Sequence, residues 1–259
     1  MFFLVLQLKL RLDFEQLSIF IRLCENDRLV ENSSKTVAQE GRLTNTAEAK
    51  QTLHTSGLVL HRAALYDLTL WLLSLGREKA LREKVLRLAR LSPGEHVLDV
   101  GCGTGTLAIA AKRQVGTTGT VYGVDASPEM LARASKKASK AGVGIVLKNG
   151  LVESLPFQDA QFDVVLSTVM LHHLPGKLRR QCAGEIRRVL KPGGRVLAVD
   201  FGTSPTQRRG IVAHFHRHGH ISLAEVVAIF NEAGMSIVES GAVGISDLQF
   251  VLATAPSCE

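Results

Sequence analysis

The residues best placed to do chemistry are three glycines and one carboxylate. Gly101, Gly103 and Gly105 follow directly after a short apolar run, and Asp125 ends the next apolar run. Glycines at a turn between a strand and a helix let the backbone approach a ligand closely. A carboxylate at the end of the neighbouring strand accepts hydrogen bonds from both hydroxyls of a ribose, each worth about 1.5–3 kcal/mol. The pattern predicts a site for a nucleoside-type ligand.

Two features bear on the class of that ligand. A dinucleotide-binding turn has a third glycine where this chain has Thr106, which argues against a pyrophosphate at the helix N-terminus. Asp125 alone does not separate the two classes, because dinucleotide folds place an acid similarly. Its alternative role, capping the next helix, is already filled by Ser127, with Pro128 at the first helical position. A nucleoside whose amino-acid tail lies against the turn fits better.

Alternating strands and helices must position these residues. We expect strands at 96–100, 121–124, 145–147, 162–167, 195–201, 236–240 and 247–254. Helices are expected after the glycine turn to residue 111, after Ser127, up to residue 190, and from the capping box at Ser222 to residue 233. Repeated strand–helix units predict a Rossmann-like α/β fold, with a central, mostly parallel seven-stranded sheet and helices on both faces.

Longer motifs on these elements resemble a known family. VLDVGCGTG, VYGVDASPEML, ESLPFQDAQFDVVLS and RVLKPGGRV occur in this order, and they are similar to successive motifs of the class I S-adenosylmethionine-dependent methyltransferases. The run LHHL at 171–174, and ALYD at 64–67, resemble the branch that methylates small molecules, including the ubiquinone and menaquinone C-methyltransferases. Those quinone enzymes usually carry an Arg-Asn pair where His172 and His173 stand.

The resemblance implies S-adenosyl-L-methionine as cofactor and assigns its contacts. Asp99 and the three glycines are expected at the methionine part, Asp125 at the ribose, and Ala126 and Met130 at the adenine. Tyr66 either closes over the cofactor or belongs to the core. The remaining expected contacts are Gly150, Leu151 and Val152 at the adenine edge, and Ser167. Relatives commonly have Asp where Leu151 stands, and leucine cannot accept a hydrogen bond. Either the backbone alone makes that contact or adenine affinity is reduced.

Histidines supply two further candidates. His172 and His173 follow the fourth strand, where an imidazole could act as a general base or orient the acceptor; the alternative is that the pair only packs the loop. The four alternating histidines at 214–220 lie on one side of an extended segment and lack a nearby Cys, Asp or Glu. We therefore expect no metal site and interpret that segment as a substrate loop.

Composition places limits on the whole chain. The net charge of +7 suggests nucleic-acid binding. We interpret the densest basic group instead as a solvated helix face. It comprises Lys177, Arg179, Arg180, Arg187, Arg188 and Lys191. Four scattered cysteines fit a reducing cytoplasm, and no apolar run is long enough to span a membrane, although peripheral contact stays open. We expect an N-terminal extension and polar linker at 1–56, a helical lid at 57–92 and the methyltransferase domain at 93–256.

These expectations lead to one function and two alternatives. The leading hypothesis is in-line transfer of a methyl group to C, O or N of a small apolar acceptor. The first alternative is a cofactor-binding module without turnover. The second is a nucleic-acid methyltransferase, although the chain has no N-P-P-Y or D-P-P-Y tetrapeptide. The sequence leaves the acceptor and the oligomeric state open.

Overall fold

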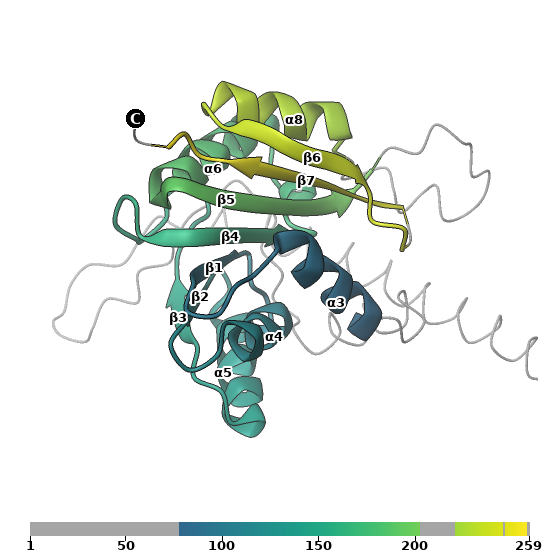
Figure 1. Ribbon diagram of the computed structural model, residues 1–259. Helices are drawn as coiled ribbons and strands as arrows, with labels where there is room; N and C mark the ends of the chain where they lie inside the picture. Colours follow the sequence, from purple (N-terminus) through teal and green to yellow (C-terminus); the bar gives the residue numbers. More distant parts are fainter. Residues whose placement is uncertain (1–77, 203–220, 246, 258–259) are drawn as a thin grey trace, which may run out of the picture. The chain divides into compact units, whose positions relative to one another are not determined.

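A computed structural model describes residues 78–202, 221–245 and 247–257, which contain one seven-stranded sheet with helices on both faces (Figure 1). The strands are β1 (His96–Val100), β2 (Thr120–Asp125), β3 (Val146–Asn149), β4 (Phe162–Thr168), β5 (Leu190–Phe201), β6 (Ser236–Ala242) and β7 (Leu248–Thr254). Their order in the sheet is β3-β2-β1-β4-β5-β7-β6. Strands β1 to β5 run parallel, and β7 is antiparallel to both of its neighbours. The predicted fold class is confirmed.

The strand order reverses direction at β1. The chain moves outward from β1 to β2 and β3, and then returns to place β4 on the other side of β1. There Val100 of β1 lies opposite Ser167 of β4. In open α/β sheets ligands bind beyond the carboxyl ends of the strands at such a reversal. This topology therefore predicts a site beyond β1, β2 and β4.

The helices cover the sheet as two layers with separate cores. They are α3 (Glu78–Ala89), α4 (Thr106–Val115), α5 (Pro128–Ala141), the short 3₁₀ helix η1 (Leu171–His173), α6 (Gly176–Val189) and α8 (Leu223–Glu232). One core joins α3 and α4 to the sheet, and the other joins α6 and α8 to its opposite face. Figure 1 shows α4 and α5 together near β2 and β3, whereas α8 lies near β6 and β7.

Helix starts follow the predicted capping residues. The Ser127 hydroxyl accepts a hydrogen bond from the backbone N–H of Met130 at 3.3 Å, and Pro128 occupies the first turn of α5. The Ser222 hydroxyl accepts one from the N–H of Glu225 at 3.1 Å and so begins α8. Both caps satisfy donors that a helix leaves without an intrahelical partner.

Some element boundaries differ from the sequence expectation. β5 begins at Leu190, not at Arg195, because the pairing with β4 shifts register: Phe162 pairs with Leu190, whereas Val164 already pairs with Arg195. Leu190 is almost fully buried, so its packing holds this early part of the strand despite the glycines that follow. α4 continues beyond residue 111 to Val115, which is buried in the core that α4 shares with α3.

Several expectations fall outside the described residues. These are the extension and linker at 1–56, most of the segment at 57–92 with Tyr66, and the histidines at 214–220. The described part of 57–92 includes α3, whose Val85, Leu86 and Ala89 are buried against the sheet. No helix within the described residues is long and apolar enough to cross a membrane.

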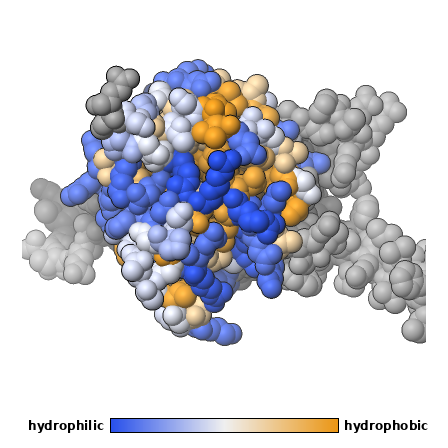
Figure 2. All heavy atoms as spheres, in the orientation of Figure 1, coloured by the Kyte–Doolittle hydropathy of each residue, from blue (hydrophilic) through white to orange (hydrophobic). Residues whose placement is uncertain are grey.

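The described surface is mostly hydrophilic in the view of Figure 2, with hydrophobic residues interspersed. The basic group on and after α6 is extensively paired with acids. The ion pairs join Arg179 to Glu225, Arg180 to Glu232, Arg188 to both Asp159 and Glu185, and Lys191 to Asp163. Much of the positive charge along this helix is therefore balanced locally.

Candidate active site

The glycine turn between β1 and α4 is built from left-handed backbone. Gly101, Gly103 and Gly105 have φ angles of 71°, 51° and 73°, a region that residues with a side chain rarely adopt. A Cβ at Gly105 would lie 2.8 Å from the Cβ of Ala134 on α5. The glycines are therefore needed for the shape of the turn, and Gly105 also for the close approach of α5.

Asp125 joins this turn to the start of α5. One of its carboxylate oxygens accepts from the Gly103 N–H and the other from the Ser127 N–H, both at 2.9 Å. Burial raises the pKa of Asp125, and the two backbone hydrogen bonds act in the opposite direction. Each carboxylate oxygen has a second lone pair, so Asp125 can still accept hydrogen bonds from a diol beyond the end of β2.

Asp99 is a buried carboxylate with an unused oxygen. The residue is 2% exposed, and burial, followed by the charge of Asp125, raises its pKa to about 7. Among the described residues its Oδ2 atom has no hydrogen-bond partner. Leaving a buried acceptor without a partner costs about 1–3 kcal/mol. A ligand cation near Asp99 would offset the cost of ionising the buried carboxyl group and would give the Oδ2 atom a hydrogen-bond partner.

Two hydroxyls at the end of β4 are also buried without a partner in the described part of the chain. They belong to Ser167 and Thr168. Ser167 was predicted as a cofactor contact, but Thr168 was not singled out. Its position directly after the predicted strand, at the same sheet edge as the glycine turn, was the signal that could have identified it.

The residues expected around the adenine lie beside Asp125, but not all of them have accessible side chains. The Gly150 N–H donates to the Asp125 carbonyl at 3.2 Å, and Asn149 donates to the Asp125 and Ala126 carbonyls. Leu151 is half-buried and forms an isolated bridge with Ser154.

Ala126 is also half-buried, whereas the side chains of Met130 and Val152 are buried. Val152 belongs to the core beneath α6 and α8. A contact from Val152 to a ligand would therefore come from its backbone, since its side chain is already enclosed by neighbouring residues.

His172 is paired with Asp200 at the carboxyl ends of β4 and β5. The His172 Nδ1 atom lies 2.6 Å from Asp200 Oδ1, and the His172 backbone N–H donates to Asp200 Oδ2 at 3.2 Å. The two side chains are 10% and 5% exposed. Sequence reasoning missed Asp200; an acid at the end of an apolar strand next to β4 was the available signal.

Val169, just before η1, has a strained backbone. Its φ of 55° is unfavourable for a β-branched residue and costs about 1–3 kcal/mol. Its N–H donates to the Val199 carbonyl at 2.7 Å, which ties this turn to β5. The strained turn lies between the end of β4 and η1, where it helps to set the course of the chain from β4 to the His172–Asp200 pair.

His173 differs from His172 in its surroundings. Burial lowers its pKa to about 4, with the neighbouring His172 acting in the same direction. The two imidazole rings are in contact, with centroids 3.9 Å apart. His173 is therefore neutral at physiological pH and a weak base, so the geometry favours His172 for proton transfer.

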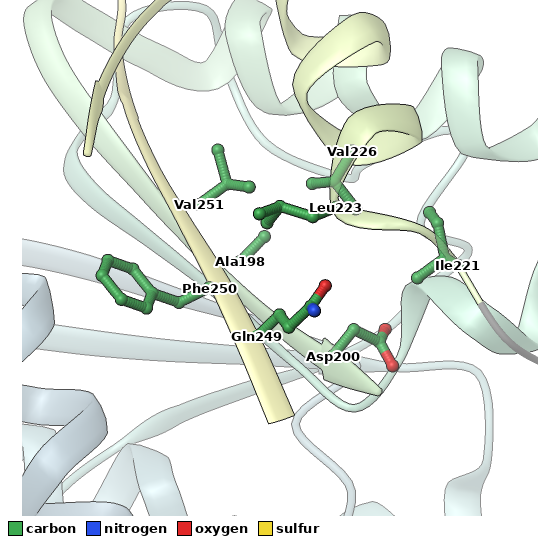
Figure 3. A pocket seen from close by; sticks show the side chains of 8 residues that line it. All are labelled: Ala198, Asp200, Ile221, Leu223, Val226, Gln249, Phe250 and Val251. Atoms are coloured by element: carbon green, nitrogen blue, oxygen red, sulfur yellow. The ribbon is translucent and has the colours of Figure 1, made fainter. Parts of the chain in front are cut away.

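A small pocket adjoins Asp200 (Figure 3). It is lined by Ala198, Asp200, Ile221, Leu223, Val226, Gln249, Phe250 and Val251. Figure 3 shows the polar Asp200 and Gln249 side chains near each other, with Leu223 and Val226 on the side of α8. The Gln249 Oε1 atom is buried and lacks a partner among the described residues. The pocket has room for a water-sized group, such as one hydroxyl.

Other candidate chemistry is not assembled in the described residues. No three His, Cys, Asp or Glu side chains in that part of the chain gather closely enough to bind a metal ion. Cys102 and Cys182 are free and buried, and burial raises the pKa of both thiols. They are consequently poor nucleophiles at neutral pH.

The family comparison agrees with this geometry. Residues 97–194 match a family described as a methyltransferase domain. That match spans the glycine turn, Asp125 and the histidine pair. Over these residues the chain is similar to a methyltransferase domain, and the sheet that contains them has the Rossmann-like arrangement expected of one.

Similar proteins include quinone enzymes. The demethylmenaquinone methyltransferase of Bacillus mycoides is 36% identical over 154 residues, which cover 58% of this chain and 64% of that protein. The chloroplastic 2-phytyl-1,4-beta-naphthoquinone methyltransferase of Arabidopsis thaliana is 38% identical over 146 residues, 55% of each chain. The chain thus spans less than two thirds of the length of these two curated relatives.

A solved structure supports the same assignment. The crystal structure of an S-adenosylmethionine-dependent methyltransferase from Aquifex aeolicus has a TM-score of 0.57 and 27% sequence identity. The match covers 67% of this chain and 88% of that one. The chain is therefore similar to that methyltransferase in both sequence and fold.

The residues of this methyltransferase domain fit the family's cofactor. The unpartnered Asp99 Oδ2 suits the ammonium group of a methionine, and the carboxylate of Asp125 suits a ribose diol. The turn formed by Gly101, Gly103 and Gly105 connects β1, which carries Asp99, to α4, and the Gly103 N–H donates to Asp125. The structure brings the expected methionine and ribose contacts together at one edge of the sheet.

Proposed function

We propose that the chain binds S-adenosylmethionine and methylates a ring carbon of a small quinol. The observation that carries this proposal is the His172–Asp200 pair, which lies at the sheet edge that also holds Asp99 and Asp125. Relatives named for demethylmenaquinone and naphthoquinone supply the acceptor class. The quinone ring of such an acceptor is small and apolar apart from its oxygens.

The cofactor, when bound, supplies an electrophilic methyl group on a sulfonium. The residues of the chain have two tasks. Asp99 and Asp125 hold the two ends of the cofactor, and the backbone of the glycine turn fixes it between them. His172 accepts the proton of the acceptor's hydroxyl at the free nitrogen of its ring.

Removing that proton makes the neighbouring ring carbon nucleophilic. The electron pair of the broken O–H bond moves into the ring, and the ring carbon would form the new C–C bond to the methyl group as the bond from that methyl to sulfur breaks, with its electron pair left on sulfur as a neutral thioether. The same carbon then loses its own hydrogen as a proton, which restores the aromatic ring. The reduced quinol is required, because the carbons of the oxidised quinone are electrophilic.

The pocket beside Asp200 offers a contact for one hydroxyl of the acceptor. Gln249 Oε1 can accept a hydrogen bond there, in a pocket that Leu223 and Val226 also line. We place the reaction in the cytoplasm, at a membrane surface where an acceptor with a long apolar tail would partition.

A nucleic-acid acceptor receives less support. Arg179, Arg180, Arg188 and Lys191 are ion-paired with acidic side chains, so the basic group is not presented as a row of unpaired charges. We call Asp99, the glycine turn and Asp125 the cofactor cradle. A cofactor-binding module without turnover would retain this cradle but would gain nothing from the His172–Asp200 pair.

A transfer assay tests the proposal. The full chain is incubated with S-adenosylmethionine carrying a labelled methyl group and with demethylmenaquinol or demethylmenaquinone. We expect label in the ring of the product with the quinol only. His172→Ala should lower kcat by at least about a hundredfold and leave cofactor affinity unchanged, because general-base help is worth about 10²–10⁴. Absence of transfer to the quinol, with cofactor bound, would exclude this acceptor class.

A further inference from the structure

Asp200 accepts three hydrogen bonds at the end of β5. Its Oδ2 atom accepts from the His172 backbone N–H, and its Oδ1 atom accepts from the Phe201 N–H at 2.8 Å and faces His172 Nδ1 at 2.6 Å. Asp200 is 5% exposed, so few of these interactions are shared with solvent. Three donors around one carboxylate leave it the role of acceptor in each contact.

The contact with the Asp200 carboxylate determines which ring nitrogen of His172 carries the proton. A carboxylate can only accept, so the 2.6 Å contact requires a proton on Nδ1. In the neutral ring the other nitrogen, Nε2, then has a free lone pair. The carboxylate therefore selects the tautomer that can act as a base through Nε2.

The ring is also held by its neighbours. His173 contacts it at a centroid distance of 3.9 Å, and the Phe201 ring meets it edge to face at 5.5 Å. His173, with its pKa lowered to about 4, adds no positive charge at neutral pH. Asp200 is thus the charged group in direct contact with the His172 ring in the described structure.

We propose that Asp200 is a positioning residue that fixes His172 as the Nδ1–H tautomer and makes Nε2 the proton acceptor in methyl transfer. The proposal rests on the function proposed above. The proton leaves the acceptor hydroxyl and binds Nε2, and the imidazolium that forms lies against the negative charge of Asp200. Release of this proton to solvent returns the neutral tautomer.

A purely structural role for Asp200 makes a different prediction. Asp200 also accepts from the His172 and Phe201 backbone N–H groups, and those bonds alone would stabilise η1 and the end of β5. In that case its removal would lower stability without changing the tautomer of His172. The tautomer and the turnover number therefore separate the two roles.

The test combines nitrogen-15 NMR of the histidine rings with kinetics. In the full-length protein we expect His172 to be protonated at Nδ1 and unprotonated at Nε2. Asp200→Ala should abolish this single-tautomer pattern and lower kcat at least about a hundredfold, with the KM for both substrates little changed. Asp200→Asn retains the shape and removes the charge, so it should also lower kcat while folding normally.

Matched variants complete the design. Asp163→Asn, at a strand aspartate paired with Lys191, is the control and should leave both tautomer and turnover unchanged. The double variant His172→Ala/Asp200→Ala should be no slower than His172→Ala alone, because the two residues act as one unit. Asp200→Glu, which keeps a carboxylate, should recover part of the activity.

Three results would overturn the proposal. They are a proton on Nε2 of neutral His172 in the parent protein, an unchanged tautomer in Asp200→Ala, or turnover of the folded Asp200 variants within about fivefold of the parent. The NMR measurement needs no acceptor. If the expected tautomers are found but no quinol is methylated, the acceptor class is wrong and the positioning by Asp200 still holds.

Discussion

At the scale of single residues, the site depends on one buried carboxylate, Asp99, and one half-buried carboxylate, Asp125. Burial raises the pKa of both Asp99 and Asp125, the charge of Asp125 raises that of Asp99 further, and Asp99 in addition has an oxygen without a partner among the described residues. The protein retains these unfavourable groups at the reversal point of the sheet, where a ligand with a cation and a diol would stabilise both. The carboxylates that would bind the ligand are thus the same groups that lower the stability of the ligand-free protein.

Cofactor affinity should consequently depend on pH through Asp99. Its pKa of about 7 means that about half of the ligand-free molecules carry a proton there at neutral pH. A cationic ligand favours the ionised form, so binding releases that proton. Affinity should therefore fall as pH drops below 7, by at most about tenfold per pH unit.

Calorimetry between pH 5.5 and 8, in buffers of different ionisation enthalpy, measures both the affinity and the proton release. Asp99→Asn is the control: it should bind the cofactor more weakly and show a much flatter pH profile. Proton uptake at pH 6 in the parent, or a profile unaffected by Asp99→Asn, would contradict this role.

At the scale of elements, local signals and long-range packing contributed differently. The glycine turn, the Ser127 and Ser222 caps and most strand positions were predictable, because each depends on a few neighbouring residues. The position of Asp200 at the end of an apolar strand could have marked it as a candidate, but the start of β5 at Leu190 and the pairing of Asp200 with His172 were not predictable. They depend on the register of β4 against β5, and no local pattern specifies which residues two strands bring together.

The cap of α5 gives a test at this scale. Ser127 is buried and accepts from the Met130 N–H, so Ser127→Ala leaves that donor without its partner. The free energy of unfolding should fall by about 1 kcal/mol, measured by urea denaturation. Ser135→Ala, at an exposed position of the same helix, should stay within about 0.5 kcal/mol of the parent. Equal effects of the two substitutions would show that the cap is not stabilising.

At the scale of the whole molecule, the described residues already contain all seven strands and both cores. Arg195 of β5 ties the end of α3 to the sheet: it pairs with Glu95 before β1 and donates to the carbonyls of Ala89 and Arg90. We therefore propose that residues 1–56 are dispensable for the methyltransferase domain.

A shortened chain that begins at Gly57 tests this proposal. It should remain monodisperse and bind S-adenosylmethionine within about threefold of the full chain, because the cradle and both cores are retained. Size-exclusion chromatography and calorimetry measure the two properties. Aggregation, or a larger loss of affinity, would mean that the first 56 residues contribute to the domain or its cofactor site.

The central claim is that the carboxyl edge of β1 and β2 is a cradle for S-adenosylmethionine, and titration calorimetry of the full chain tests it most directly. We predict saturable binding of S-adenosylmethionine and of its demethylated product at one site per chain, with no binding of NAD. Gly103→Val should abolish the binding, because a β-branched residue is strained at a φ of 51° and the turn would lose its shape. Saturable binding of NAD, with none of S-adenosylmethionine, would contradict the account.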